Sequence, residues 1–499
     1  MDIIINKYSK HTIPLICLSV LVGVFITSQI TLRDFPNSGD EYSYLISAKL
    51  FSVGKLSVPS PNHKEFYDIF HIINDGKFYG KYSPGWPFFL MFGEFLGFPA
   101  IINMIFAILT LVVMYRLARE LFSERIAKIS LLLMATNSYF LFNSSSFFPH
   151  TSSQFFLLLF VYFYFKKLKT EKSGSWFLLG IVLGISFLIR QLDAVVFGFC
   201  IFTHYIYFIL KNKKICKDEI GKWGLFLLGF FLLFGLLLIY NYLQTGDPFL
   251  MPFVKYDPNE KLGFHYPYLE SFKWAVENNI IHRIIFLNRW VPFYFVFMFL
   301  ALFSSKRYSK EHLFLMFALF ISMLFAYFFY LFSPGNQYGP RYLYSSSFAI
   351  FILMAIGIEK VTIYKWKGYK WFLPGVLTLN IGLFIYLSIL FHNQVNMRME
   401  LYDKVKKLNL SNAIVFLEDP CGSMPIEDLT RNGIYFNNSV LFVKSFDQEN
   451  RLLMEDFPDR KYYLWGCDEI EFEGNKFIFH EGEAININCT LRPLIFEGS

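Results

Sequence analysis

Two adjacent carboxylates, Asp40 and Glu41, are the residues of this chain best placed to do chemistry. They begin an amphipathic stretch, for which we expect a short helix near residues 41–53 that lies along a membrane surface and stops at Gly54. A carboxylate fixed there is a candidate general base, which would take the proton from an acceptor hydroxyl. The structural alternative is a capping box, because Ser38 and Glu41 have its spacing and acids are favoured at a helix N-terminus.

Three cations near turns are candidates for binding a phosphate. Lys81 lies in the segment 80–87, where two prolines and a glycine predict a turn and exclude a helix. Arg341 lies in a Gly-Pro turn, and Arg190 ends the apolar run 175–189. An arginine can hold a phosphate through two parallel hydrogen bonds. The alternatives are membrane-interface anchors for Lys81 and Arg341, and a self-contained ion pair of Arg190 with the nearby Asp193.

His150 follows a proline in the turn before another apolar run. It is either a hydrogen-bonded structural residue or a substrate contact. One histidine does not make a metal site, and the six cysteines form no C-x-x-C pair. The sequence therefore indicates no metal constellation and identifies no cofactor.

The composition predicts that membrane helices position these residues. Of the 499 residues, 55% are hydrophobic and only 17% are charged, whereas soluble domains carry about 25% charged residues. The 63 Phe and 31 Tyr suit lipid-facing helices with aromatic belts. The net charge of +7 comes from basic residues in short segments between apolar runs, which indicates membrane topology and does not indicate nucleic-acid binding.

Apolar runs of nearly membrane-spanning length predict eleven transmembrane helices. The first run has no small-residue cleavage site after it, so we interpret it as an uncleaved helix. Lys and Arg gather in alternate short loops, which predicts a cytoplasmic N-terminus and an external C-terminus in the cell (inner) membrane. The expected helices are 12–32, 98–115, 127–143, 147–165, 175–189, 192–210, 223–243, 286–304, 312–332, 342–358 and 372–391.

Three longer segments then lie outside: residues 33–99, residues 244–285 and the tail, residues 392–499. The tail alternates β-type runs with polar turns, so we expect a small soluble extracytoplasmic α/β domain beside a transmembrane domain of residues 1–391. Cys421, Cys467 and Cys489 allow one disulfide there, although their spacing does not identify the pair. The expected strands are Ala413–Leu417, Val440–Val443, Lys461–Trp465 and Phe477–His480.

The predicted topology places all the candidates selected for local reasons on the external side of the membrane. A reaction at a lipid headgroup requires its side chains on one side, so this placement favours function over the separate structural alternatives. The residues concerned are Asp40, Glu41, Lys81, His150, Arg190 and Arg341.

The acidic pair after the first helix, with an interfacial helix behind it, resembles the C-type fold of membrane glycosyltransferases. The likeness is greatest to family 39, the protein O-mannosyltransferases, with the lipid A aminoarabinose transferases as near relatives. Short stretches carry the likeness over most of the chain. They are residues 80–87, 148–150, 188–193, 240–248, 256–258, 338–342 and 457–460.

The resemblance implies an inverting transfer of a sugar from a polyprenyl-phosphate donor. Asp40 would match the family's catalytic acidic residue, and Lys81 would match a basic residue that holds the donor phosphate. The Lys-Tyr-Ser-Pro context of Lys81 departs from the best-known transferases, and Gln191 stands where similar proteins often have proline. We assign Glu41 as a support for Asp40, and Arg190 and Arg341 as further phosphate contacts. The candidate substrate contacts are Tyr338, His150 and Asp257.

The function that we expect is therefore a glycosyltransferase acting on the external face of the membrane. Its partners are a polyprenyl-phosphate-linked sugar, a glycan, lipid or protein acceptor, and membrane lipid, with no nucleic acid. One alternative is a transporter or flippase of lipid-linked sugars, but helices broken near their middles, which are typical of transporters, are not evident. The other is an O-antigen ligase or polymerase, for which the acidic pair after the first helix is not expected.

Overall fold

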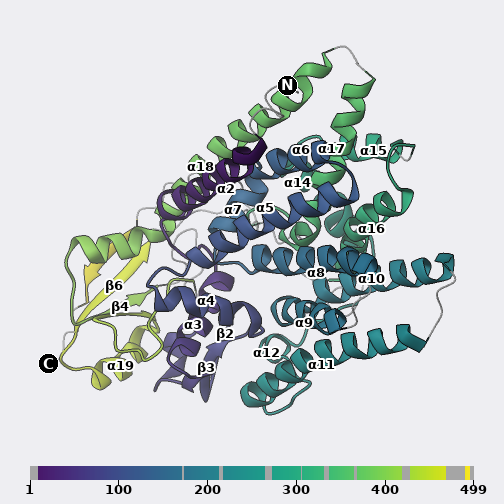
Figure 1. Ribbon diagram of the computed structural model, residues 1–499. Helices are drawn as coiled ribbons and strands as arrows, with labels where there is room; N and C mark the ends of the chain where they lie inside the picture. The colour runs from purple at the N-terminus through teal and green to yellow at the C-terminus, as the bar shows by residue number, and fades with distance from the viewer. Residues whose placement is uncertain are drawn as a thin grey trace. The chain divides into compact units, whose positions relative to one another are not determined.

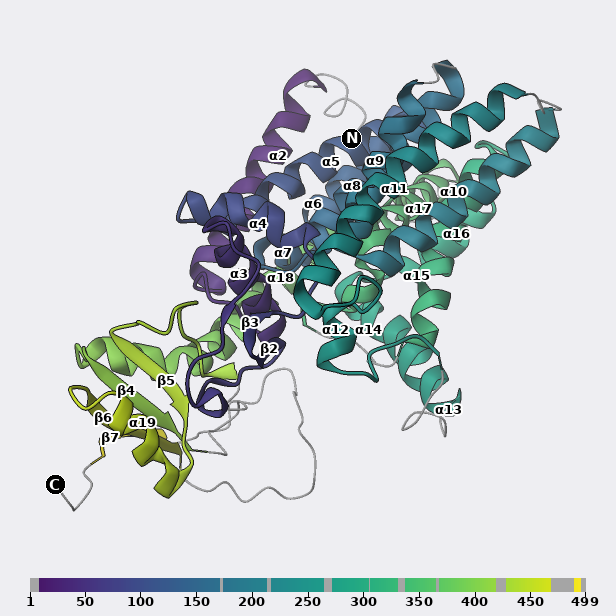
Figure 2. The same cartoon turned by 90° about the horizontal axis from the view of Figure 1, so that it is seen from below.

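The computed structural model describes residues 9–170, 174–212, 217–263, 272–304, 306–330, 337–364, 368–418, 428–467 and 489–494. These residues are mainly helical and include two small sheets (Figures 1 and 2). The chain divides into two compact units. We call them the helical unit (Met1–Ser28, Ser83–Phe89 and Ala100–Leu387) and the sheet unit (Gln29–Tyr82, Leu90–Pro99 and Ser388–Ser499). The division differs from the single boundary expected after residue 391, because most of the first loop segment belongs with the tail.

Apolar helices build the helical unit (Figure 2). Among the described residues, seven helices are long and apolar enough to cross a membrane. An eighth span is possible if the bent pair Phe272–Trp290 and Tyr294–Leu302 counts as one. The helices that belong wholly or partly to this unit are α2 (Ser9–Ile26), α4 (Gly85–Phe95), α5 (Ile101–Leu121), α6 (Glu124–Ala135), α7 (Ser138–Ser145), α8 (His150–Thr170), α9 (Gly174–Ile189), α10 (Gln191–Asn212), α11 (Lys217–Thr245), α12 (Pro252–Tyr256), α13 (Phe272–Ala275), α14 (Arg283–Trp290), α15 (Tyr294–Leu302), α16 (Lys310–Ala326), α17 (Ser347–Ile363) and α18 (Tyr369–Lys407), with the π and 3-10 turns η1 (Thr27–Thr31), η3 (Val276–His282), η4 (Tyr327–Phe329) and η5 (Arg341–Ser346).

All eleven expected apolar segments fall on helical stretches, but two of them are not single helices. The segment expected at 127–143 is divided into α6 and α7, because Asn137 adopts an extended backbone and its side chain caps α7 by accepting the N–H of Tyr139. The segment expected at 286–304 is broken between α14 and α15, where Pro292 precedes Phe293, which has φ 61°. The helices on either side of that break are bent by 102°.

Helices α9 and α11 lie side by side because glycines remove the side chains between them (Figure 2). A Cβ atom on Gly180 of α9 would lie 2.0 Å from the carbonyl oxygen of Phe226 in α11. A Cβ atom on Gly229 of α11 would lie 2.3 Å from the carbonyl oxygen of Phe177 in α9. The contact is therefore backbone against backbone, and no larger residue fits at either position.

The sheet unit contains a three-stranded antiparallel sheet in the order β1-β3-β2 and a four-stranded sheet in the order β5-β4-β6-β7. In the larger sheet β4 pairs in parallel with β5 and β6, while β7 is antiparallel to β6. Three of the expected tail strands are confirmed, and the fourth, Phe477–His480, lies outside the described residues. The elements are α3 (Gly39–Ser52), β1 (Val58–Pro59), η2 (Lys64–Tyr67), β2 (Ile72–Asp75), β3 (Lys77–Gly80), β4 (Ala413–Leu417), β5 (Val440–Lys444), η7 (Asp447–Glu449), α19 (Asn450–Asp456), β6 (Lys461–Cys467) and β7 (Cys489–Pro493).

The first loop segment joins the tail because it supplies part of the tail's hydrophobic core. Phe66 and Tyr67 of η2 pack with Ile414 and Phe416, which alternate along β4 toward the same face. The other face of β4 packs against Leu401 of α18 in a separate apolar cluster. The larger sheet is therefore covered on both faces, as parallel strands require.

The short helix expected at 41–53 is α3. Residues 41–48 are all buried, whereas Lys49 is exposed. The first three turns of the helix therefore pack against protein. Tyr42 fixes it to the tail, because its hydroxyl donates to the carbonyl of Asn432 (2.5 Å) and the Arg431 guanidinium lies 5.2 Å from its ring centre. Burial raises the pKa of the Tyr42 phenol, which therefore remains protonated and able to donate.

We predict that Gly180→Ala destabilises the protein, because the added methyl must push α9 away from α11 at about 1–3 kcal/mol. The matched control is Gly235→Ala in α11, where a Cβ meets nothing within 4 Å. The control should be neutral or gain up to about 1 kcal/mol from its higher helix propensity. Thermal unfolding of both variants in detergent measures the difference. Equal midpoints of thermal unfolding for Gly180→Ala and Gly235→Ala would contradict the close contact between α9 and α11.

Candidate active site

Asp40 lies in the first turn of α3, and two side chains approach its carboxylate. The helix begins after Ser38, whose hydroxyl accepts the N–H of Glu41 (3.3 Å). Tyr82 donates its hydroxyl hydrogen to Asp40 Oδ1, and His71 Nε2 lies 3.6 Å from the same oxygen. The Asp40 side chain is 15% exposed, so it is accessible but largely enclosed. An ionised carboxylate at a helix N-terminus is stabilised by the free backbone N–H groups there.

Glu41 has a different environment and makes the contact of a helix cap. It is 1% exposed, and its Oε2 accepts the backbone N–H of Asn37 (2.8 Å). The capping box expected from Ser38 and Glu41 is therefore formed, with the glutamate reaching one residue further back than the usual N-cap N–H. Arg398 donates to the carbonyl oxygen of Asn37, which further holds the start of α3.

The hairpin of β2 and β3 positions Lys81 and Tyr82 beside α3. The carbonyl oxygen of His71 accepts the Lys81 N–H (3.0 Å) and the Ser43 hydroxyl of α3 (2.7 Å). Lys81 is 3% exposed, and its Nζ lies 5.3 Å from the Tyr82 ring centre. The Tyr82 ring stacks on Tyr44 of α3, with their centres 4.4 Å apart. Asp40, Lys81 and Tyr82 thus belong to one local arrangement within the sheet unit.

The segment after Tyr82 was expected to be a turn, and this expectation was wrong for its second half. Helix α4 begins at Gly85 and contains Pro87 in its first turn, where the missing N–H of proline costs nothing. Within the helical unit, Gln191 donates to the Ser83 hydroxyl (2.6 Å) and Trp86 donates to the carbonyl of Phe147 (2.7 Å). Gln191, which stands where similar proteins often have proline, therefore makes a hydrogen bond of its own.

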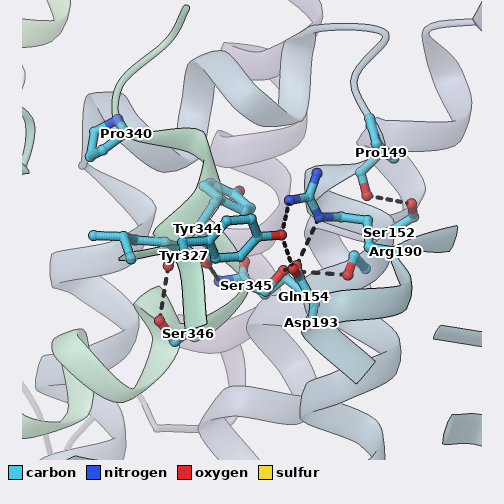
Figure 3. Close-up of polar contacts among 12 residues, drawn as sticks. Pro149, Ser152, Gln154, Arg190, Asp193, Tyr327, Pro340, Tyr344, Ser345 and Ser346 are labelled. Atoms are coloured by element: carbon cyan, nitrogen blue, oxygen red, sulfur yellow. Dashed lines mark hydrogen bonds and ion pairs between the residues drawn. The ribbon is translucent and has the colours of Figure 1, made fainter. Parts of the chain in front are cut away.

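Arg190 lies between α9 and α10 and forms the ion pair that was its structural alternative (Figure 3). Its Nε donates to Asp193 Oδ2 (2.8 Å), and its Nη2 donates to the Tyr327 hydroxyl (2.6 Å). Asp193 also accepts hydrogen bonds from Tyr327 and Ser345, each at 2.5 Å. This buried carboxylate is therefore well satisfied by three donors that come from different elements.

Three arginines surround the ring of Tyr342 in the helical unit. Their Cζ atoms lie 5.8 Å (Arg190), 5.4 Å (Arg283) and 5.8 Å (Arg341) from the ring centre. The Tyr342 ring stacks on Tyr327 with 4.9 Å between centres. We call Arg190, Arg283 and Arg341 the arginine cluster. Guanidinium groups gathered on aromatic faces offer several donors to an anion in a setting where most charges are excluded.

Phe148 links three residues that were predicted separately. The Arg341 Cζ lies 4.6 Å from its ring centre, His150 stacks on it at 5.3 Å, and Tyr338 packs edge-on at 6.1 Å. His150 and Tyr338 are buried. The structure thus brings Arg341, His150 and Tyr338 together, next to the arginine cluster.

Asp257 belongs to neither arrangement. It follows the last residue of α12, and its Oδ1 accepts the N–H of Asn259 (2.9 Å) in a local turn. Its carbonyl oxygen accepts the N–H of Glu260 (2.9 Å). These contacts are those of a turn-forming aspartate and give no support to a substrate contact.

Sequence reasoning missed His71 and Arg283. The signal for His71 was available, because Asp75-Gly76 between apolar residues is a hairpin signature, and pairing outward from it places His71 opposite Lys81. No local pattern identifies Arg283, which was assigned to a loop. It is fully buried and donates to the Tyr327 carbonyl (2.8 Å) and the Asn279 side chain (3.0 Å). Across the described ranges, no group of three or more His, Cys, Asp or Glu side chains could hold a metal.

Comparisons with known proteins agree with this architecture. Residues 86–240 match the family model of dolichyl-phosphate-mannose-protein mannosyltransferase. Among solved structures, the chain is similar to ArnT from Cupriavidus metallidurans in the apo state, with a TM-score of 0.56, 11% identity, and coverage of 92% of this chain and 93% of that one. ArnT bound to undecaprenyl phosphate gives a TM-score of 0.54 at 10% identity, covering 90% and 92% of the two chains. No curated protein sequence matches significantly.

The chain has the C-type glycosyltransferase fold. The Archaeoglobus fulgidus oligosaccharyltransferase is a further similar structure, with a TM-score of 0.50, 12% identity, and coverage of 90% of this chain and 67% of that one. The apolar helices of the described residues are those of a multi-pass membrane protein. The matched segment includes His150 and Arg190 and does not reach Asp40, Lys81 or Arg341.

We predict that Arg190→Ala and Asp193→Ala each destabilise the protein by about 3–5 kcal/mol, because removing one partner leaves the other charge buried. The double variant should lose much less than the sum of the two single losses, since the residues form one pair. Thermal unfolding in detergent of the two single variants, the double variant and the wild type gives the four stabilities of this double-mutant cycle. Additive losses would show that Arg190 acts independently of Asp193.

Proposed function

We propose that this protein is an inverting glycosyltransferase that uses a polyprenyl-phosphate sugar as donor and Asp40 as the general base. The observation that carries the proposal is the position of Asp40, in the first turn of α3 and hydrogen-bonded by Tyr82. The similarity to ArnT, a protein solved with undecaprenyl phosphate bound, supports the choice of donor class. The proposal covers a hexose or a pentose as donor sugar and a glycan, lipid or protein as acceptor.

In the proposed reaction an acceptor hydroxyl oxygen bonds to the anomeric carbon on the face opposite the phosphate. The bond between that carbon and the phosphate oxygen breaks, and its electron pair leaves with the polyprenyl phosphate. The hydroxyl proton moves to Asp40. Because the acceptor attacks from the face opposite the phosphate in a single displacement, the anomeric configuration inverts and no covalent enzyme intermediate forms. Glu41 holds the start of α3 through Asn37 and thereby supports the base.

Cations would stabilise the phosphate as its charge develops. Lys81 and Arg341 are our candidates for this role, with Arg283 as an addition from the arginine cluster. Arg190 forms an ion pair with Asp193 and donates to Tyr327, so we assign it mainly to holding Tyr327 and the arginine cluster in position. His150 and Tyr338 pack around Phe148 beside Arg341, and we assign them to the surroundings of the donor.

We propose that the reaction occurs on the extracytoplasmic face of the cell membrane. The basic residues of the alternate short loops support this orientation. The disulfide at Cys489 in the sheet unit supports it further, since structural disulfides form mainly outside the cytoplasm.

Asp40→Asn should abolish turnover while leaving the fold intact. Asparagine is nearly isosteric and is itself a good residue at a helix N-terminus, whereas loss of a general base costs about 100-fold or more in rate. Purified protein in detergent is assayed with a panel of radiolabelled polyprenyl-phosphate sugars, scoring the release of free polyprenyl phosphate. The variant should purify and unfold like the wild type. Near wild-type turnover of Asp40→Asn would show that Asp40 serves only to cap the helix and is not the general base.

Arg341→Ala and Lys81→Ala should each weaken binding of undecaprenyl phosphate by about tenfold or more, as expected for loss of a hydrogen bond to a charged group. Undecaprenol, which lacks the phosphate, is the matched ligand, and its affinity should not change. Arg289→Ala, at an exposed arginine of α14, is the matched protein control. Unchanged affinity for undecaprenyl phosphate in both test variants would remove these residues from the phosphate site.

A further inference from the structure

We propose that His71 is a positioning residue for Asp40: its Nε2–H hydrogen-bonds the carboxylate and keeps it ionised and aimed during proton transfer. The inference rests on the proposed function of Asp40 as general base. It concerns a residue that lies outside the family match, because the matched segment begins at residue 86.

The first observation is the distance between the two groups. His71 Nε2 lies 3.6 Å from Asp40 Oδ1, the oxygen that also accepts the Tyr82 hydroxyl. The imidazole is 29% exposed and the carboxylate 15%, so water screens the contact only partly. A small movement of either side chain brings the pair to hydrogen-bond length, and such contacts often tighten only when substrate is bound.

The second observation is that two hydrogen bonds hold the carbonyl group of His71. Its carbonyl oxygen accepts hydrogen bonds from Ser43 of α3, one turn beyond Asp40, and from the N–H of Lys81. The backbone that carries the imidazole is therefore tied to the helix that carries Asp40 and to the strand end that carries Lys81. A positioning side chain requires such a supporting set of hydrogen bonds.

The third observation is local strain. His71 has φ 64°, in the left-handed region that non-glycine residues adopt uncommonly, although Asn, Asp and His do so more often than the others. Such a conformation persists only where the surrounding structure enforces it, and it is found disproportionately at functional sites. Here the strained backbone turns the imidazole toward the start of α3, where a Cβ on Gly39 would lie 3.1 Å from His71 Cδ2.

The charged and titratable groups around the imidazole determine the effect on pH dependence. Asp40 faces it from α3, the Tyr82 ring centre lies 6.1 Å away, and Asp428 lies beside Gly39. Lys81 contacts His71 through its backbone N–H. A donor to the ionised carboxylate favours that form, so removing the donor lets Asp40 bind a proton more readily. The acidic limb of the rate profile should then move to higher pH.

The test compares His71→Gln, which keeps an N–H donor, with His71→Phe, which lacks one, since both substitutions meet the same strained backbone. Release of polyprenyl phosphate from the polyprenyl-phosphate sugar that the wild type turns over best is measured from acidic to neutral pH. In His71→Phe we expect kcat to fall roughly tenfold, with an unchanged KM for the donor and an acidic limb displaced by about one pH unit, since one pH unit corresponds to a tenfold change in proton binding. His71→Gln should restore most of the rate and the position of the limb.

The control is His63→Phe, at another histidine of the sheet unit with positive φ (51°), which lies 3.6 Å from Asp456 and away from α3. The pH dependence of kcat in His63→Phe should match that of the wild type. A His71→Phe profile that is lowered uniformly without a displaced limb, or a His71→Gln variant no better than His71→Phe, would overturn the inference. Full activity of Asp40→Asn would instead overturn the proposed function, so the two failures are distinguishable.

Discussion

The close approach of strand β3 to helix α3 is the constraint on which the carboxylate site depends. A Cβ atom on Gly80 would lie 2.4 Å from the Ser47 hydroxyl and 2.6 Å from the Ser43 carbonyl oxygen, so only glycine allows the strand to rest directly on the helix. The next two residues are Lys81 and Tyr82, which consequently arrive beside Asp40. Loss of that contact would move Tyr82, which donates to Asp40, away from the carboxylate.

The arginine cluster depends on a different principle, the satisfaction of charge where water is scarce. Asp193 accepts hydrogen bonds from three donors, and the stacked rings of Tyr327 and Tyr342 provide faces for the guanidinium groups. Each buried charge is thus held by several contacts, which come from α10, α14, η3, η4 and η5. Because each member of such a network depends on the others for its hydrogen bonds, the individual arginines stay in fixed positions.

The sequence predicted what local patterns specify and missed what long-range contacts decide. Apolar runs located the helices, and alternating residues located three tail strands, because burial follows directly from hydrophobic periodicity. The capping box at Ser38 and Glu41 was predictable from spacing alone. The union of the first loop with the tail was not, since it rests on Phe66 and Tyr67 packing against strands far along the chain. Arg283 was missed for the same reason, because its partner Tyr327 is remote in sequence.

The shared core of the sheet unit also dictates an order of events during biosynthesis. Phe66 and Tyr67 leave the ribosome roughly 350 residues before β4, the strand against which they pack. At translation rates of about 5–20 residues per second, this apolar pair waits roughly 20–70 s for its partners. The surroundings of Asp40 therefore become complete only after β4 has been synthesised, and a chain terminated before β4 would carry its acidic pair without the fold that supports it.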